Sequence, residues 1–367
     1  MLKITWTRGP NLPQGYQDSD GGVIHGTLVS ACGFCSGVEA DNAKKPGIYP
    51  RGFLKKVWGL NITDPSAKWQ DLPEFPGVAR QGLFAAKVDE QLYMWGGFSY
   101  EEPYTFADGW RLSKSADDKW AWDALPPLPW KLTGASAAAV GKKIYVFGGG
   151  DYDGVNGTHT DTDRDKKMPR LGARLLMIDT ENLDAGWKEL SECPGTPRFV
   201  NAIQAVGDRI YVIGGATGLP TNTIVDNWVY NSATDAWSRI RDLPIASGNF
   251  PRSTNVMFAD RYIILPGGYQ YGAVANPDGT TRAVYGKPSN LNPGTGLYND
   301  VFAYDTQTDT FGTADKMPID NNLPMTVVHE DKIYLLGGES GGGIVEGEFY
   351  GHHPDLLLIG NIEAIAQ

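Results

Sequence analysis

Trp237-Ser-Arg-Ile-Arg-Asp-Leu243-Pro244 is one of six copies of a short pattern that runs through the sequence. Each copy consists of an aromatic residue, five variable residues, an apolar residue and a proline. The other copies begin at Trp6, Trp69, Trp122, Trp187 and Phe311. A fixed pattern that recurs at intervals of about 50 to 74 residues indicates one supersecondary unit, used six times and interrupted by loops of different lengths.

A second pattern lies about midway between these copies and ends in two glycines, as in Lys143-Ile-Tyr-Val-Phe-Gly148-Gly149. Short turns such as Gly141-Lys142 join each of these apolar strands to a preceding strand, which is a hairpin signal. A third strand follows a variable loop and the aromatic pattern opens a fourth, so each unit has four strands. The related copies end at Gly97, Gly215, Gly268 and Gly338, with a degenerate copy ending at Gly33.

Six such units resemble a kelch β-propeller, and the resemblance covers essentially the whole chain. It implies an all-β fold of six blades, each with four antiparallel strands. The copy from Trp6 to Pro13 lacks the first three strands of a blade and the last unit lacks the fourth, so we expect the N-terminal strand to close the last blade. The single domain would divide into residues 1–20 for this closing strand, then 21–80, 81–133, 134–198, 199–252, 253–322 and 323–367 for blades 1 to 6.

The composition agrees with this class and excludes others. Among 367 residues, the 46 glycines, 24 prolines, 11 tryptophans and 17 tyrosines are typical of a turn-rich all-β protein. The net charge is −11 and no run of Lys or Arg could follow a phosphate backbone, so neither nucleic acid nor an anionic membrane is expected as a partner. No apolar stretch is long enough to span a membrane. The compartment stays open, with a periplasmic or secreted location favoured if a leader has been trimmed.

Loop lengths indicate one functional face. The segments after the diglycine are long in blades 1, 3 and 5, at residues 35–54, 151–170 and 269–297. In a four-stranded blade these loops lie on the same face as the loops that enter the next blade. Because function usually sits on loops that a rigid scaffold positions, we expect the site on this face, around the central axis.

Three arginines enter the innermost strands on this face: Arg80, Arg198 and Arg252. Guanidinium groups that converge there would bind a carboxylate or sulfate through paired hydrogen bonds. The alternative is structural, because arginines of kelch proteins often bridge neighbouring blades through buried hydrogen bonds. Asn201 and Asn255 each follow one of these arginines by three residues, and either present amides to the same site or satisfy backbone groups at blade edges.

Aromatic and polar residues in the long loops suggest a small-molecule sugar or glycan as the partner. Tyr100, Asp151 and Tyr269 are the candidates, since rings cover the apolar face of a pyranose and polar groups bind its hydroxyls. Solvated loop residues would show the same composition.

The sequence predicts neither a metal site nor a cofactor. Asp161, Asp163 and Asp165 alternate as in a calcium loop, but the glycine and distal glutamate of an EF-hand are missing, which leaves calcium open. Cys32 and Cys35 have the spacing of a redox motif without its strand-to-helix context. Cys193 occupies the apolar position of its repeat and is expected in the core. There is no phosphate-binding loop, nicotinamide fingerprint or serine-hydrolase elbow.

Within the kelch proteins, the last unit is similar to that of bacterial N-acetylneuraminate epimerases, which interconvert the anomers of free sialic acid. The similar stretch is Ile333-Tyr-Leu-Leu-Gly-Gly-Glu339-Ser-Gly-Gly-Gly343. The resemblance also implies a catalytic Glu and a nearby Arg in a middle blade, but Gly214-Gly-Ala-Thr-Gly-Leu-Pro-Thr-Asn222 contains neither. Glu339 is then the best candidate for the acid/base group, with an inter-blade hydrogen bond as its structural alternative.

Two functions are compatible with these observations. The first is an enzyme that resembles sugar epimerases, or mutarotases, and acts on an acidic or N-acetylated sugar. The second is a kelch module that binds a glycan or a protein partner without turnover, which the missing Glu and Arg favour.

Overall fold

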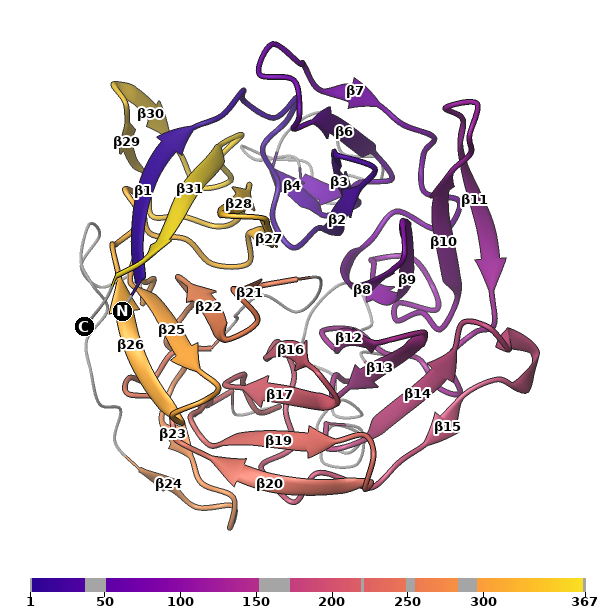
Figure 1. Cartoon of the computed structure of the whole chain (residues 1–367), viewed down its shortest axis with the longest axis vertical. Coiled ribbons are helices and arrows are strands. Elements are labelled where there is room, and N and C mark those ends of the chain that lie inside the picture. Colours follow the sequence, from indigo (N-terminus) through magenta and orange to yellow (C-terminus); the bar gives the residue numbers. More distant parts are fainter. Residues whose placement is uncertain are drawn as a thin grey trace.

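The computed structural model describes residues 2–36, 51–151, 172–218, 221–248, 255–282 and 296–365. Six four-stranded antiparallel sheets in this part of the chain are arranged around a common centre (Figure 1). The only helical element among the described residues is one 3-10 turn, η2 (Leu183–Ala185). The fold is therefore the all-β propeller that the repeats predict, and we refer to the six sheets as blades 1 to 6 in chain order.

Each blade begins with its innermost strand. Blade 1 contains β2 (Asp20–Ile24), β3 (Thr27–Ala31), β6 (Val57–Asn61) and β7 (Gln70–Asp71). Blade 2 contains β8 (Gln81–Val88), β9 (Gln91–Phe98), β10 (Gly109–Lys114) and β11 (Trp120–Leu125). Blade 3 contains β12 (Ser136–Val140), β13 (Lys143–Phe147), β14 (Leu175–Asp179) and β15 (Lys188–Glu189).

The second half of the chain repeats this order. Blade 4 contains β16 (Ala202–Val206), β17 (Arg209–Ile213), β19 (Asn227–Asn231) and β20 (Ala236–Ile240). Blade 5 contains β21 (Met257–Phe258), β22 (Tyr262–Pro266), β25 (Val301–Asp305) and β26 (Thr310–Ala314). Blade 6 contains β27 (Met325–His329), β28 (Lys332–Leu336), β31 (Leu357–Ala364) and, outermost, β1 (Leu2–Arg8).

The two ends of the chain share blade 6. Strand β1 pairs antiparallel with β31 from Leu2↔Ala364 to Arg8↔Leu358, which is the pairing that the incomplete first repeat predicts. Figure 1 shows the ends of the chain beside each other. The pairing joins residues 350 to 362 positions apart in the sequence and so ties down both termini.

Four of the five tryptophans of the aromatic pattern connect neighbouring blades, and Trp187 is the exception. In blade 2, the indole N–H of Trp122 donates to the Pro73 carbonyl of blade 1 at 2.9 Å. In blade 4, Trp237 donates to Ser191 of blade 3 at 2.7 Å. Each acceptor lies two residues before the apolar residue of the preceding repeat. The same bond joins Trp69 to Pro10 and Trp6 to Asp315. The spacing of the pattern thus fixes how one blade docks on the next.

Backbone hydrogen bonds also link the blades next to the centre. Gly82 N donates to Asp18 O, Gly134 N to Gly82 O and Val200 N to Gly134 O, which connects blades 1 to 4 in order. Asp18 N donates in turn to Leu323 O of blade 6. These five residues all have positive φ, between 50° and 69°. The left-handed conformation suits the two glycines, whereas it strains Val200 because its side chain is β-branched.

Three small sheets form in the described parts of the loops. They are β4 (Phe34–Ser36) with β5 (Arg51–Phe53), the hairpin β29 (Gly343–Val345) with β30 (Glu348–Tyr350), and the sheet β18 (Thr223–Ile224), β23 (Val274–Ala275) and β24 (Thr281–Arg282). The parallel pairing of β18 with β23 joins the loops of blades 4 and 5. The repeats do not predict these sheets, because they lie in the variable segments. No helix in the described ranges is long and apolar enough to cross a membrane.

The diglycine allows close contact between blades, which a pair of substitutions can test. Gly148 has φ +70°, and a Cβ there would lie 2.6 Å from the Arg198 carbonyl oxygen of blade 4. Gly141 has a similar φ, +57°, but its Cβ would meet nothing within 4 Å. We expect Gly141→Ala to lower the free energy of unfolding by about 1 kcal/mol through backbone strain. We expect Gly148→Ala to lower it by about 2 to 4 kcal/mol, because a clash adds to the strain. Equal urea midpoints for the two variants would contradict this account.

Candidate functional site

Six pairs of residues surround the centre at the loop end of the blades. In each pair, the residue after the diglycine pairs with a residue just before or at the start of the innermost strand of the same blade. We call these twelve residues the rim. The pairs, from blade 1 to blade 6, are Gln17–Phe34, Gln81–Phe98, Thr133–Gly150, Phe199–Ala216, Gly248–Tyr269 and Asn322–Glu339.

Polar side chains are concentrated on one side of the rim. Blades 6, 1 and 2, which are neighbours in Figure 1, contribute the amides of Asn322, Gln17 and Gln81. Glu339 of blade 6 is the only charged residue among the twelve. Blades 4 and 5 contribute only Phe199, Ala216, Gly248 and Tyr269. We call the Asn322–Glu339, Gln17 and Gln81 side the polar arc.

One carboxylate oxygen of Glu339 is hydrogen-bonded and the other lies near a histidine. Oε2 accepts a hydrogen bond from Asn322 Nδ2 at 3.1 Å, and Oε1 lies 3.6 Å from His352 Nε2. The backbones of Glu339 and Asn322 also exchange two hydrogen bonds, of 2.7 and 2.9 Å. The Glu339 side chain remains 30% exposed, so the carboxylate is oriented and still accessible to a ligand.

The second histidine extends this network to blade 1. His353 Nε2 lies 2.8 Å from Gln17 Oε1, and the His353 ring packs edge-on against Phe34 with 5.9 Å between centroids. The His352 and His353 rings lie 4.5 Å apart. Blade 6 and blade 1 are therefore joined across the polar arc by side chains.

Tyr100 lies in an aromatic cluster beside the polar arc. Its ring contacts Phe53, Phe98 and Phe34, with centroid distances of 4.7, 6.0 and 6.5 Å. Tyr100 itself is only partly buried. A half-buried ring on an aromatic base is a rigid apolar surface next to polar groups, which is the arrangement predicted for sugar recognition.

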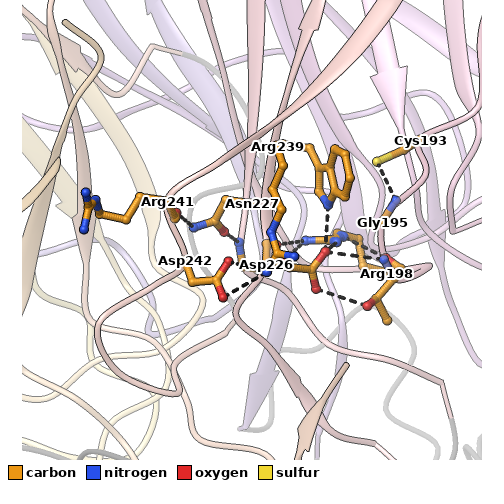
Figure 2. Close-up of polar contacts among 11 residues, drawn as sticks. Cys193, Gly195, Arg198, Asp226, Asn227, Arg239, Arg241 and Asp242 are labelled. Carbon is orange, nitrogen blue, oxygen red and sulfur yellow. Dashed lines mark hydrogen bonds and ion pairs between the residues drawn. The ribbon is translucent and has the colours of Figure 1, made fainter. Parts of the chain in front are cut away.

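Arg80 and Arg198 are buried and make hydrogen bonds within their own blades, which is the arrangement of the structural alternative. Their side chains are 1% and 0% exposed. Figure 2 shows Arg198 beside Asp226. Arg198 Nε donates to Thr196 O, Nη1 to the carbonyls of Gly214 and Asp226, and Nη2 to Asp226 Oδ2 at 2.7 Å. Four of the five N–H groups are thus used inside blade 4.

Arg80 makes an equivalent set of bonds in blade 2. Its partners are Val78 O, Gly96 O and both carboxylate oxygens of Asp108. In both blades the glycine follows the arginine by 16 residues and the aspartate by 28. A tryptophan 30 residues after the arginine, Trp110 or Trp228, donates to the same aspartate. The two arginines therefore belong to a repeated module that fastens the start of a blade to its diglycine and third strand.

The Arg198–Asp226 pair makes stability dependent on pH. Burial tends to raise the pKa of Asp226, but the positive charge of Arg198 and the Trp228 hydrogen bond outweigh it, so the pKa is lowered. A lowered pKa contributes stability above the unfolded value of about 4, and this contribution is lost as the pH falls through the folded value. We expect Asp226→Asn to be less stable than wild type at pH 7, with the difference shrinking below about pH 4. Urea midpoints that keep a constant difference down to pH 2 would contradict this.

The other residues that the sequence suggests for ligand binding lie in different surroundings. Asn255 donates to Val328 O and accepts from Met257 N, so it satisfies backbone groups between blades 5 and 6. Asn201 is fully buried and donates to Ala202 O. Asp151 is 8% exposed. Tyr269 is a rim residue and stacks edge-on with Tyr271 at 4.9 Å. Arg252 lies outside the described residues.

The described residues, the three cysteines among them, include no candidate metal site. Cys32, Cys35 and Cys193 are buried, and burial raises the pKa of the Cys193 thiol to about 11. No group of three His, Cys, Asp or Glu residues among the described positions could hold a metal ion. The Asp161, Asp163 and Asp165 loop lies outside the described residues.

Sequence reasoning missed Gln17 and Asn322 and gave His352 no role. A signal for the first two exists, because five of the six rim pairs have the same separation of 17 residues, as in Gln17–Phe34 and Asn322–Glu339. Alignment of the six repeats at the diglycine would have placed both amides on the rim. His352 has no such signal, since it comes from the loop after the β29–β30 hairpin.

Comparison with known proteins agrees with this architecture. Residues 49–268 match the KLHDC2/KLHL20/DRC7 Kelch-repeats domain family. The N-acetylneuraminate epimerase of Haemophilus influenzae (strain 86-028NP) is 25% identical, with 91% of this chain and 88% of the relative covered. That of Pasteurella multocida (strain Pm70) is 24% identical, with 91% and 89% covered. The solved structure of YjhT has a TM-score of 0.67 at 17% identity, covering 97% of this chain and 99% of that one, and supports the fold.

Proposed function

The chain belongs to the kelch-repeat family, and on that premise we propose that its loop face binds an acidic or N-acetylated sugar such as N-acetylneuraminate and speeds the exchange between its anomers. The observation that carries the proposal is the polar arc, where the only rim carboxylate lies among amides and histidines. Similarity to two N-acetylneuraminate epimerases over 91% of the chain supports the choice of sugar.

Anomer exchange needs only proton transfer at two oxygen atoms. The anomeric hydroxyl loses a proton as the ring C–O bond breaks, and the ring oxygen gains one, so no proton is lost overall. The open-chain form then closes on the other face of the carbonyl by the reverse steps. A carboxyl group that can both accept and donate a proton suits this chemistry. Glu339 is such a group, held in place and accessible on the polar arc.

The neighbouring rings would support the sugar itself. Tyr100 and Phe34 lie beside the polar arc, where they could cover the apolar face of a pyranose while Gln17 and Gln81 bind its hydroxyls. Arg80 and Arg198 are buried within blades, so we assign neither to the sugar carboxylate. Arg252 stays the proposed partner for that carboxylate.

The acid/base group is assigned to blade 6 because the middle blade lacks the residues that the resemblance implies. The stretch Gly214–Asn222 contains neither Glu nor Arg. Two of its described residues bond to each other, with Thr217 N donating to Asn222 O and Asn222 N to Thr217 Oγ1.

Exchange spectroscopy by ¹H NMR tests the proposal. The exchange rate between the two anomers of N-acetylneuraminate would be measured with and without micromolar protein, at a pH where the uncatalysed rate is low. We expect a rate that rises in proportion to protein concentration. A rate equal to that of buffer would overturn the catalytic proposal.

The missing Glu and Arg favour a second candidate function, a glycan-binding module without turnover. Saturation-transfer NMR on the same samples distinguishes the two. Transfer of saturation to the sugar without faster exchange would support the binding module, whereas faster exchange would exclude it.

A further inference from the structure

We infer that His352 is a positioning residue for Glu339 and that the two side chains share one proton. This inference rests on the proposed function, in which Glu339 is the acid/base group. It concerns how that carboxyl group is kept ready to both accept and donate a proton. The geometry of three groups in blade 6 carries it: Glu339, Ser340 and His352.

The His352 ring is fixed in one orientation. The ring nitrogen Nδ1 lies 3.2 Å from the Ser340 carbonyl oxygen. The Ser340 backbone N–H also donates to the His352 carbonyl at 2.8 Å, so the two segments are joined next to the ring. Ser340 is itself anchored, because its hydroxyl donates to the buried carboxylate of Asp320 at 2.9 Å. The His352 ring is therefore bonded to a residue that is itself anchored in blade 6.

This orientation determines which nitrogen carries the proton. A carbonyl oxygen can only accept, so Nδ1 must be protonated to bond to Ser340. In the neutral ring, Nε2 then has a lone pair, and it faces Glu339 Oε1 at 3.6 Å. At 3.6 Å the two groups are not yet hydrogen-bonded, and a proton on either one would draw them together. In this proposal the pair holds that one proton in addition to the one on Nδ1.

The other carboxylate oxygen does not compete for this proton. Glu339 Oε2 accepts from Asn322 Nδ2, which is an N–H donor without an exchangeable acid proton at neutral pH. The titratable groups around His352 are Glu339, His353 at 4.5 Å between ring centroids, and Asp320 beyond Ser340. The His352 side chain is 61% exposed, so the pair can exchange its proton with water between turnovers.

The consequence for the reaction is a carboxyl group that can work in both directions. With the proton on His352, the Glu339 carboxylate can accept the proton of the anomeric hydroxyl. With the proton on Glu339, the same group can donate to the ring oxygen. His352 does not contact the sugar in this account; it acts through Glu339.

Two measurements test the inference. The first is ¹⁵N NMR of the His352 ring without sugar, assigned by comparison with His352→Gln. We expect the neutral ring to be the Nδ1–H tautomer, although the Nε2–H tautomer is preferred by free histidine in water. The second is the anomer exchange of N-acetylneuraminate. We expect His352→Gln to lower kcat about 10- to 100-fold with KM and the urea midpoint unchanged, and to alter the pH profile of kcat. His25→Gln, at an exposed turn of blade 1, is the matched control and should leave all of these unchanged.

The outcomes separate this inference from the proposed function. A wild-type protein that speeds exchange while His352 is the Nε2–H tautomer would overturn the inference and leave the function standing. If His352→Gln lowered the urea midpoint as well as kcat, the inference would also be overturned, since a purely structural role has that effect. A wild-type protein that does not speed exchange would overturn the proposed function, and with it this role for His352.

Discussion

Replacing Arg198 with alanine is expected to lower the free energy of unfolding by about 3 to 5 kcal/mol, the largest effect on stability that we predict for this protein. The reason is the burial of both partners, since the side chains of Arg198 and Asp226 are 0% and 2% exposed. The variant would leave the Asp226 carboxylate buried without its counterion, together with unpaired carbonyls at Gly214 and Thr196. The measurement is the urea midpoint of unfolding.

Two further variants keep this prediction testable. Arg239→Ala removes an arginine of the same blade whose ion pair with Asp242 is exposed, and we expect a loss below about 1 kcal/mol. If Arg198→Ala does not fold, Arg198→Lys serves instead, because lysine keeps the charge but cannot reach all the partners of a guanidinium fork. We expect it to be less stable than Arg239→Ala. Equal free energies of unfolding for Arg198→Lys and Arg239→Ala would show that the buried bonds of Arg198 do not stabilise the blade.

Replacing Glu339 with glutamine is expected to slow anomer exchange about 10²- to 10⁴-fold, the largest effect on activity that we predict. Glutamine has nearly the same shape and can still pair with Asn322, but it cannot exchange a proton at working pH. We therefore expect sugar binding to change only a few-fold. The measurement is the exchange rate by NMR, with binding followed by saturation transfer.

A matched control separates this effect from a general loss of negative charge. Glu363 is an exposed residue of β31 in the same blade, and its change to glutamine should leave the exchange rate unchanged. If Glu339→Gln retained the wild-type rate, the acid/base role would belong to another residue. If it lost sugar binding as well, the role of Glu339 would be binding and not proton transfer.

The blades could be predicted from sequence because local chemistry sets them. Apolar alternation, turn residues and the diglycine recur along the chain. Six copies of the pattern therefore predict the same four-stranded unit. The incomplete first and last units also predicted the pairing of β1 with β31, which is a contact between distant residues. Four of the five repeat tryptophans donate to the preceding blade, which gives the spacing of the pattern a structural reason.

The role of the arginines was undecided from sequence because a guanidinium group can bind either an anionic ligand or a set of backbone carbonyls. The aspartate that each arginine binds in the structure favours the structural role. Asp108 and Asp226 follow Arg80 and Arg198 by the same 28 residues, and that shared spacing distinguishes a repeated structural module from a site that occurs once. The long-range pairing that brings His352 back to Glu339 has no comparable signal, since it depends on the path of a variable loop.

A crystal structure of the protein soaked with N-acetylneuraminate would test the central claim most directly. Our account predicts difference density for one sugar at the polar arc, within hydrogen-bond distance of the Glu339 carboxylate and in contact with the Tyr100 ring. Density for the sugar only elsewhere would contradict it. One such place is the 690 Å³ pocket lined by Arg261, Tyr262 and Phe311, between blades 5 and 6.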